Sequence, residues 1–203
     1  MSLLVEADSE EPAVLAVARL VGELEGNEKV ESEAASLLAK GDTAGLLVKL
    51  AGSTLLTSAS EKDAEAAFLV LAHAAGSLPP DRALAAVSAI LPRVADTQAG
   101  VAALRLRVLF ALFNAVPHAR CRFTVLLRAF QFAAATEQHE ALAHAVHKTD
   151  AWALDWALDA ADLRALRLAS YELLEKAHAG KALAALVSYL ALFEVCTLAS
   201  ASR

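Results

Sequence analysis

Hydrophobic residues recur along this chain at the three- and four-residue spacing of amphipathic helices, and short polar segments separate the hydrophobic runs. In the first run, Val14, Val17 and Val21 fall on one helical face behind Pro12, which suits a first-turn position. The pattern predicts ten or eleven helices joined by loops of a few residues, so successive helices should lie antiparallel. Their expected ranges are 12–25, 28–40, 43–57, 61–76, 79–92, 97–114, 119–135, 137–147, 150–158, 162–178 and 181–197.

Polar and helix-breaking residues mark the ends of these runs. Asp42 and Thr97 are expected N-caps, and Ser60 with Asp63 resembles a capping box in which an aspartate replaces the usual glutamate. Pro92 is expected to bend or end its helix, and Pro117 to force a turn.

Antiparallel pairs of short helices over some 200 residues favour a right-handed α-solenoid over a closed four-helix bundle. The expected organisation is an acidic flexible amino terminus (1–10), a helical-repeat domain (11–198) and a short tail (199–203). No tetratricopeptide or ankyrin signature recurs at a fixed period, so the repeats are divergent. A compact all-α globule is the alternative.

Composition strengthens the helical prediction. Of the 203 residues, 57% are hydrophobic but only 5% aromatic, because 49 are alanine and 36 are leucine. Alanine and leucine are strong helix formers, which excludes an all-β fold. The abundant apolar surface and modest charge also exclude a disordered chain.

Charge is distributed unevenly around a net value of -6. Residues 1–65 carry a net charge of -8, whereas residues 82–128 hold one acid, Asp96, and seven arginines. These arginines could meet ribosomal RNA or an acidic protein surface, or could be solvated helix edges balanced by the acidic first helices. Because the phenylalanines among them stand at core spacing, no base-stacking platform and no specific nucleic-acid recognition are expected. The seven arginines are Arg82, Arg93, Arg105, Arg107, Arg120, Arg122 and Arg128.

The helix expected over 97–114 is apolar around most of its circumference, as an inner helix between two layers would be. Arg105 falls inside the apolar arc, so it should reach a carboxylate or two helix-end carbonyls and serve a structural role. Arg107 points toward a narrow solvent strip. The apolar arc contains Val101, Leu104, Leu106, Val108, Leu109, Phe110, Leu112 and Phe113, and the strip contains Ala103, Arg107 and Asn114.

Signatures of catalysis and of metal binding are missing from the sequence. It has no glycine-rich phosphate loop, serine-hydrolase elbow or zincin motif, so no enzyme, catalytic residue or cofactor is expected. His144 and His147, with His139 nearby, lack the further ligands of a zinc site, and no metal is expected. Cys121 and Cys196 have no paired spacing and are interpreted as reduced core residues.

Two further features bear on location and packing. The longest stretch free of charged side chains in the first half, 66–80, is too short and too broken to span a bilayer, and the acidic amino terminus does not resemble a signal peptide. A cytoplasmic location without membrane contact is therefore expected. Trp152 and Trp156, four residues apart, are core anchors or an exposed docking pair.

The segment 104–130 resembles the characteristic block of the m subunits of eukaryotic translation initiation factor 3, particularly the plant-type version. The resemblance rests on Leu104-Arg105-Leu106, Leu112-Phe113-Asn114 and Arg122-Phe123. Weaker similarities in the same order extend it over most of residues 10–194: EEPAVLAVARLVGEL near the start, Ser60-Glu61-Lys62-Asp63, Asp155-Trp156 with Leu158, and Tyr189-Leu190-Ala191-Leu192-Phe193.

This resemblance implies a PCI-type protein, the class shared by initiation factor 3, the proteasome lid and the signalosome. Its members stack helical pairs before a winged helix, and that module is missing here, since the chain ends with CTLASASR after Phe193. The implied function is a non-catalytic scaffold that binds other initiation factor 3 subunits and, through them, the small ribosomal subunit. The alternatives are a helical adaptor or a subunit of the signalosome or proteasome lid, and then an all-α enzyme or ligand carrier.

The candidate residues follow from these interpretations. Structural roles are assigned to Arg105, Leu104, Leu106, Phe113, Phe123 and Trp156, and a partner surface to Arg107, Arg120, Arg122, Arg128, Tyr189 and Phe193. On the last helix, Leu186, Tyr189, Leu190 and Phe193 fall on the side where the next repeat of the family would pack. Part of that stripe should be uncovered, which favours self-association.

Overall fold

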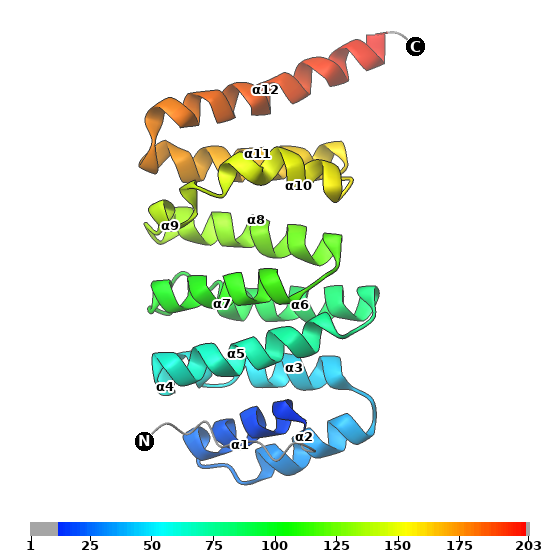
Figure 1. The fold of residues 1–203 in the computed structure, drawn as a ribbon, viewed down its shortest axis with the longest axis vertical. Coiled ribbons are helices and arrows are strands. Elements are labelled where there is room, and N and C mark those ends of the chain that lie inside the picture. The colour runs from blue at the N-terminus through cyan, green and yellow to red at the C-terminus, as the bar shows by residue number, and fades with distance from the viewer. Residues whose placement is uncertain (1–11, 202–203) are drawn as a thin grey trace. The chain divides into compact units, whose positions relative to one another are not determined.

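The computed structural model describes residues 12–201, with side chains through Phe193, and every regular element among these residues is helical. The helices pack against one another in two compact units, Met1–Val125 and Leu126–Arg203, whose boundary falls inside α8. The all-α prediction is thus confirmed for the described residues. Figure 1 shows the helices coloured along the chain from blue to red.

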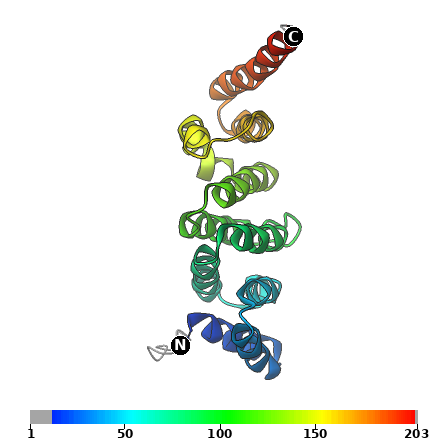
Figure 2. The same cartoon turned by 90° about the vertical axis from the view of Figure 1, so that its right-hand side faces the viewer.

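Unit 1 holds the first seven helices. Within it, α1 packs against α2, α3 against α6, and α5 against α7; Figures 1 and 2 show these helices lying side by side. The elements are α1 (Ala13–Glu25), α2 (Lys29–Ala39), α3 (Thr43–Ala51), α4 (Leu55–Ser58), α5 (Glu61–Gly76), α6 (Pro80–Val94) and α7 (Ala102–Ala115), followed by α8 (Ala119–Ala135), which crosses the boundary.

Unit 2 is organised around α11 (Ala160–Ala177), which packs against α12 (Ala179–Ala201). The remaining elements are the short α9 (His139–Ala143), a 3-10 turn (Val146–Lys148) and α10 (Thr149–Asp155). Both α9 and α10 contact α11. Leu142, Leu166 and Leu173 are fully buried and form part of the core of this unit.

Two predicted N-caps are confirmed. The Asp42 carboxylate accepts a hydrogen bond from the Gly45 amide at 2.9 Å, and the Ser60 hydroxyl oxygen accepts one from the Asp63 amide at 3.2 Å. The Ser60 hydroxyl also donates to the Asp63 carboxylate at 2.7 Å. Asp63 therefore contacts the side chain of the cap, where the glutamate of a capping box would reach the backbone amide.

The expected helix over 43–57 is wrong, because α3 ends at Ala51 and α4 begins at Leu55. The Gly52 amide bonds back to the Val48 carbonyl at 3.1 Å, and the Ser53 hydroxyl donates to the Leu50 carbonyl at 2.6 Å. These bonds satisfy carbonyls at the end of α3 and let the chain turn.

Of the two effects expected of Pro92, a bend or an end, the structure contradicts the end, since α6 continues to Val94. Leu91 and Val94 are both buried, so packing on either side of the proline holds the last turn in place. Packing here outweighs the local cost of a proline, which lacks an amide donor.

Thr97 does not cap α7, which begins only at Ala102. The Asp96 carboxylate instead accepts a bond from the Gln98 amide at 2.9 Å, and Gly100 and Val101 both take positive φ angles, 71° and 47°. Val101 therefore precedes the helix and is exposed, which contradicts its expected place on the apolar arc.

The chain around α9 and α10 is less regular than expected. The predicted helix 137–147 is only α9 followed by the 3-10 turn, and the predicted helix 150–158 ends at Asp155. Positive φ angles at Glu137 (59°) and Ala157 (49°) break the helical path at these points. At the other end, α12 runs to Ala201, past the expected end at 197.

Several expectations lie outside what the structure describes. The acidic amino terminus, 1–10, precedes the first described residue, and Cys196 lies where side chains are not described. Within residues 12–201, none of the helices combines the length and hydropathy needed for a membrane span.

Candidate functional site

Arg105 is the most constrained charged residue among the described side chains. It lies on α7 and is only 3% exposed. Its Nε donates to the Gly100 carbonyl at 2.9 Å, and its Nη1 donates to the carbonyls of Arg93 and Val94 at 2.7 and 3.1 Å. Arg93 and Val94 form the carboxyl end of α6, so the expectation of two helix-end carbonyl acceptors is confirmed.

The surroundings of Arg105 both disfavour and stabilise its positive charge. Burial lowers the pKa of the guanidinium, while the nearby Asp96 carboxylate opposes that shift. The last carbonyls of a helix lack intrahelical donors and carry the negative end of its dipole, so they suit a buried cation. The three bonds tie α7 to the end of α6 and to the turn between them.

Apart from Val101, the residues that helical spacing placed on the apolar arc or the solvent strip of α7 lie there in the structure. Leu104, Leu106 and Leu112 are buried, and Phe113 is half-buried. The strip assigned to solvent, Ala103, Arg107 and Asn114, is exposed.

Arg107 projects away from the buried face but is paired. Its Nη2 and Nε lie 2.7 and 2.9 Å from the carboxylates of Glu61 and Glu65 on α5. The hydrogen bonds that the Arg107 guanidinium donates to these two carboxylates raise the pKa of Arg107. A partner that contacts Arg107 would therefore meet a guanidinium whose single positive charge is already paired with two carboxylates.

The other arginines of the candidate partner surface differ from one another in their surroundings. Arg122 is half-buried, donates to the Val116 carbonyl at 2.9 Å and lies 5.7 Å from the Phe113 ring centre. Arg120 is exposed and lies 5.1 Å from the ring of Phe123.

Arg128 is exposed on the part of α8 that belongs to unit 2, and Phe123 is buried. Arg122 thus secures the turn between α7 and α8, whereas Arg120 and Arg128 reach solvent.

Trp152 and Trp156 stack on each other, with ring centres 5.7 Å apart and planes inclined by 7°. Both side chains are half-buried. Their exposure thus lies between the two alternatives that the sequence left open, core anchors and an exposed docking pair. Their mutual contact follows from the four-residue spacing, which places them one helical turn apart.

The residues considered for metal binding or redox chemistry do not gather into a cluster. His144 and His147 are exposed and His139 is half-buried. Among the described side chains, no three histidines, cysteines or acids are placed to hold a metal ion. Cys121 is buried, and burial raises the pKa of its thiol.

An apolar stripe runs along the exposed side of α12. Four large apolar side chains there are between 46% and 64% exposed: Leu183, Val187, Leu190 and Phe193. The expected exposure of Leu190 and Phe193 is confirmed, while Leu186 and Tyr189 are half-buried. Tyr189 and Phe193 form an edge-to-face pair with ring centres 5.2 Å apart.

Sequence reasoning missed Leu183 and Val187, the most exposed members of the stripe. Their spacing with Leu190, four and then three residues, is the helical signal that could have found them. It also missed Arg167 on α11, which donates to the Ser188 carbonyl at 2.6 Å and to the Asp150 carboxylate at 3.3 Å.

Comparison of the chain with models of known families, with curated proteins and with solved structures found no match.

Proposed function

We propose that this protein is a non-catalytic scaffold of the cytoplasm that binds other subunits of a translation initiation factor 3 complex. The proposal takes its helical pairs to be a right-handed α-solenoid of the PCI type. Two observations support it: the resemblance of residues 104–130 to the m subunits, and the exposed apolar stripe on α12.

The stripe on α12 is the observation that carries the proposal. Leu183, Val187 and Leu190 lie one helical turn apart and expose more than half of their side-chain surface to solvent. Contiguous exposed apolar patches mark protein interaction sites, because water contact with them is unfavourable. In a helical-repeat protein, an open helical face is where a neighbouring helical element or a partner subunit packs.

The block that carries the resemblance has a consistent structural role. Arg105 and Arg122 both donate to backbone carbonyls at the turns that flank α7, and Leu104 and Leu106 are buried. These residues are therefore suited to holding a helical scaffold in shape, as the proposal requires of them.

Affinity purification from the cells that produce the protein tests this function. The tagged full chain should co-purify initiation factor 3 subunits, identified by mass spectrometry. A Leu183→Lys/Leu190→Lys double variant should lose most of them. Leu154→Lys is the matched control, because Leu154 is 83% exposed but lies on α10, away from the stripe.

The alternative assignment gives a different result in the same experiment. Recovery of proteasome-lid or signalosome subunits in place of initiation factor subunits would assign the chain to one of those assemblies. Recovery of neither set, or equal recovery with the double variant, would overturn the proposed function.

A further inference from the structure

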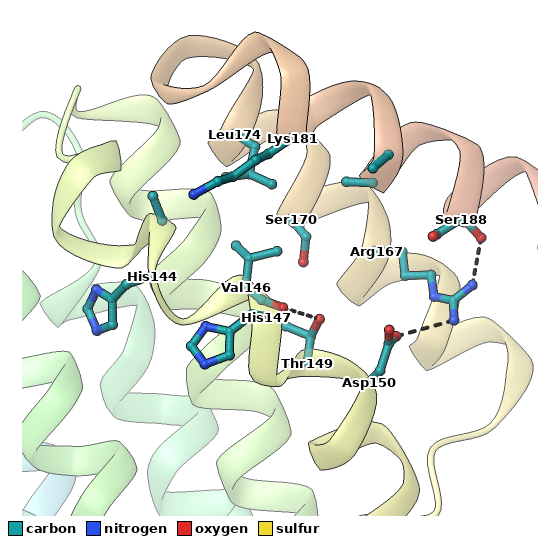
Figure 3. Close-up of a pocket in the computed structure, with 13 residues that line it drawn as sticks. His144, Val146, His147, Thr149, Asp150, Arg167, Ser170, Leu174, Lys181 and Ser188 are labelled. Atoms are coloured by element: carbon teal, nitrogen blue, oxygen red, sulfur yellow. Dashed lines mark hydrogen bonds and ion pairs between the residues drawn. The ribbon is translucent and has the colours of Figure 1, made fainter.

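A pocket of about 320 Å³ opens within unit 2, between α11, α12 and the chain from α9 to α10. Its floor is apolar, made by Ala143, Val146, Leu174 and Ala185, which belong to or pack against the core of this unit. Figure 3 shows Val146 and Ser170 in its middle, with Lys181 at one end and Arg167, Asp150 and Ser188 at the other.

The walls of this pocket are held by polar contacts. Arg167 joins α11 to α12 through the Ser188 carbonyl and to α10 through Asp150. The Thr149 hydroxyl donates to the Val146 carbonyl at 2.7 Å, and the Ser170 hydroxyl to the Leu166 carbonyl at 2.8 Å. The Thr149 and Ser170 bonds are local to their own helical turns, so the Arg167 bonds are the ones that join the walls before a ligand arrives, and such preorganisation lowers the entropy cost of binding.

Basic side chains dominate the charged rim. Lys181, His144 and His147 are exposed at the mouth, and in the part of the chain that the structure describes Lys181 forms no ion pair. Among the described residues that line the pocket, Asp150 is the one acid, and it is already bonded to Arg167. The rim therefore carries a net positive charge directly beside an apolar floor.

We propose that this pocket binds an acidic segment of a partner protein, one that inserts an aliphatic side chain while flanking carboxylates meet Lys181 and the imidazoles of His144 and His147. Charge complementarity sets the sign of the partner. The size of the cavity suits one or two aliphatic side chains, and the exposed rim places the charged contacts outside it, along a peptide backbone.

This inference rests on the proposed function only in taking the ligand to be a protein segment. It adds a second contact, chemically distinct from the apolar stripe, because its specificity comes from charge at the rim. Its test uses the purified full chain and a peptide. The pocket can therefore fail to bind the peptide while initiation factor subunits still co-purify, and the peptide can bind when no such subunits co-purify.

The probe is the peptide acetyl-Ala-Glu-Leu-Glu-Ala-amide, titrated into the isotope-labelled full chain and followed by the backbone amide resonances of Thr149, Ser170 and Ala185. We expect saturable shifts with a dissociation constant on the order of 1 mM. Replacing both glutamates of the peptide by glutamine, or its leucine by serine, should weaken binding at least about threefold.

Matched protein variants locate the site. Lys181→Gln should weaken binding at least about threefold, whereas Lys176→Gln, an exposed lysine of α11 outside the pocket, should not. Ala184→Phe should block the pocket, while Ala191→Phe on the same helix should not. Both alanines are exposed, so neither change disturbs a buried position.

Three outcomes would overturn the inference. They are no saturable shift with the peptide, equal binding of its glutamine version, and equal weakening by the Lys176 and Lys181 variants.

Discussion

The Arg105 guanidinium donates to the carbonyl oxygen of Arg93 at 2.7 Å, so a buried cation on α7 caps the carboxyl end of α6. Only two positions further along α7, Arg107 forms ion pairs with Glu61 and Glu65 of α5, and its side chain is 42% exposed to solvent. The same residue type thus has two physical roles at positions only two residues apart on one helix.

Replacing each arginine by alanine should separate these roles. Arg105→Ala leaves the buried carbonyls at the end of α6 without a donor and opens a cavity, so we expect a loss of about 3 kcal/mol in the free energy of unfolding. Arg107→Ala removes exposed ion pairs and should cost less than about 1 kcal/mol. Urea denaturation of both variants measures the difference, and equal losses would contradict a capping role for Arg105.

Local sequence rules predicted most of the fold. The predicted helix boundaries agree best with the structure where one cap or turn residue sets the boundary, as at Asp42, Ser60 and Pro117. The predicted boundaries are wrong where side-chain hydrogen bonds to nearby backbone groups replace helical ones, as at Ser53 and Asp96. Pro92 shows the opposite case, in which tertiary packing outweighs a local signal.

The candidate site was predictable only where one helix determines it. The helical wheel placed Arg105 and Arg107 on opposite sides of α7, because angular position depends on sequence spacing alone. The Arg107 partners lie more than forty residues away on α5, and the pocket of unit 2 needs three elements together. A wheel of one helix carries no information about such contacts.

Gly76 should resist substitution because the end of α5 approaches the backbone near the end of α7. A β-carbon at Gly76 would clash with the carbonyl group of Ala115, a backbone group that cannot move aside easily. We expect Gly76→Ala to lower the free energy of unfolding by about 1–3 kcal/mol, as overpacking does.

Gly180→Ala is the matched control for this substitution. Gly180 is in α12 and has open space around the position of a β-carbon, so alanine should be neutral or stabilising by up to about 1 kcal/mol. Thermal melts of both variants compare the two sites. Similar melting temperatures would show that the approach of α5 to α7 is not a steric constraint.

Acid should weaken the contact between α1 and α2. The Glu31 carboxylate lies 2.7 Å from the Arg19 guanidinium, and this hydrogen bond lowers the pKa of Glu31. A carboxyl group whose pKa is lower in the folded state stabilises the fold above its unfolded-state pKa, and this contribution is lost as the pH falls through the folded-state pKa. The stability difference between the parent protein and Glu31→Gln should thus be largest at neutral pH and shrink in acid.

Urea denaturation at neutral pH and at about pH 3 measures this change. Glu23→Gln serves as the control, since Glu23 is an exposed carboxylate of α1 that forms no ion pair within the described residues. A difference for Glu31→Gln that stays constant between the two pH values would refute the assignment.

The stripe on α12 should make the isolated chain self-associate when its partners are absent. Leu183, Val187 and Leu190 expose more than half of their side-chain surface, and pairing two such faces removes apolar area from water. Sedimentation velocity over a range of concentrations should show a reversible shift to larger species. Leu183→Lys/Leu190→Lys should raise the dissociation constant at least about tenfold, because charged ammonium groups resist burial. Leu154→Lys, on α10, should leave it unchanged, and a monomer that is independent of concentration in the parent protein would show that the stripe does not drive association.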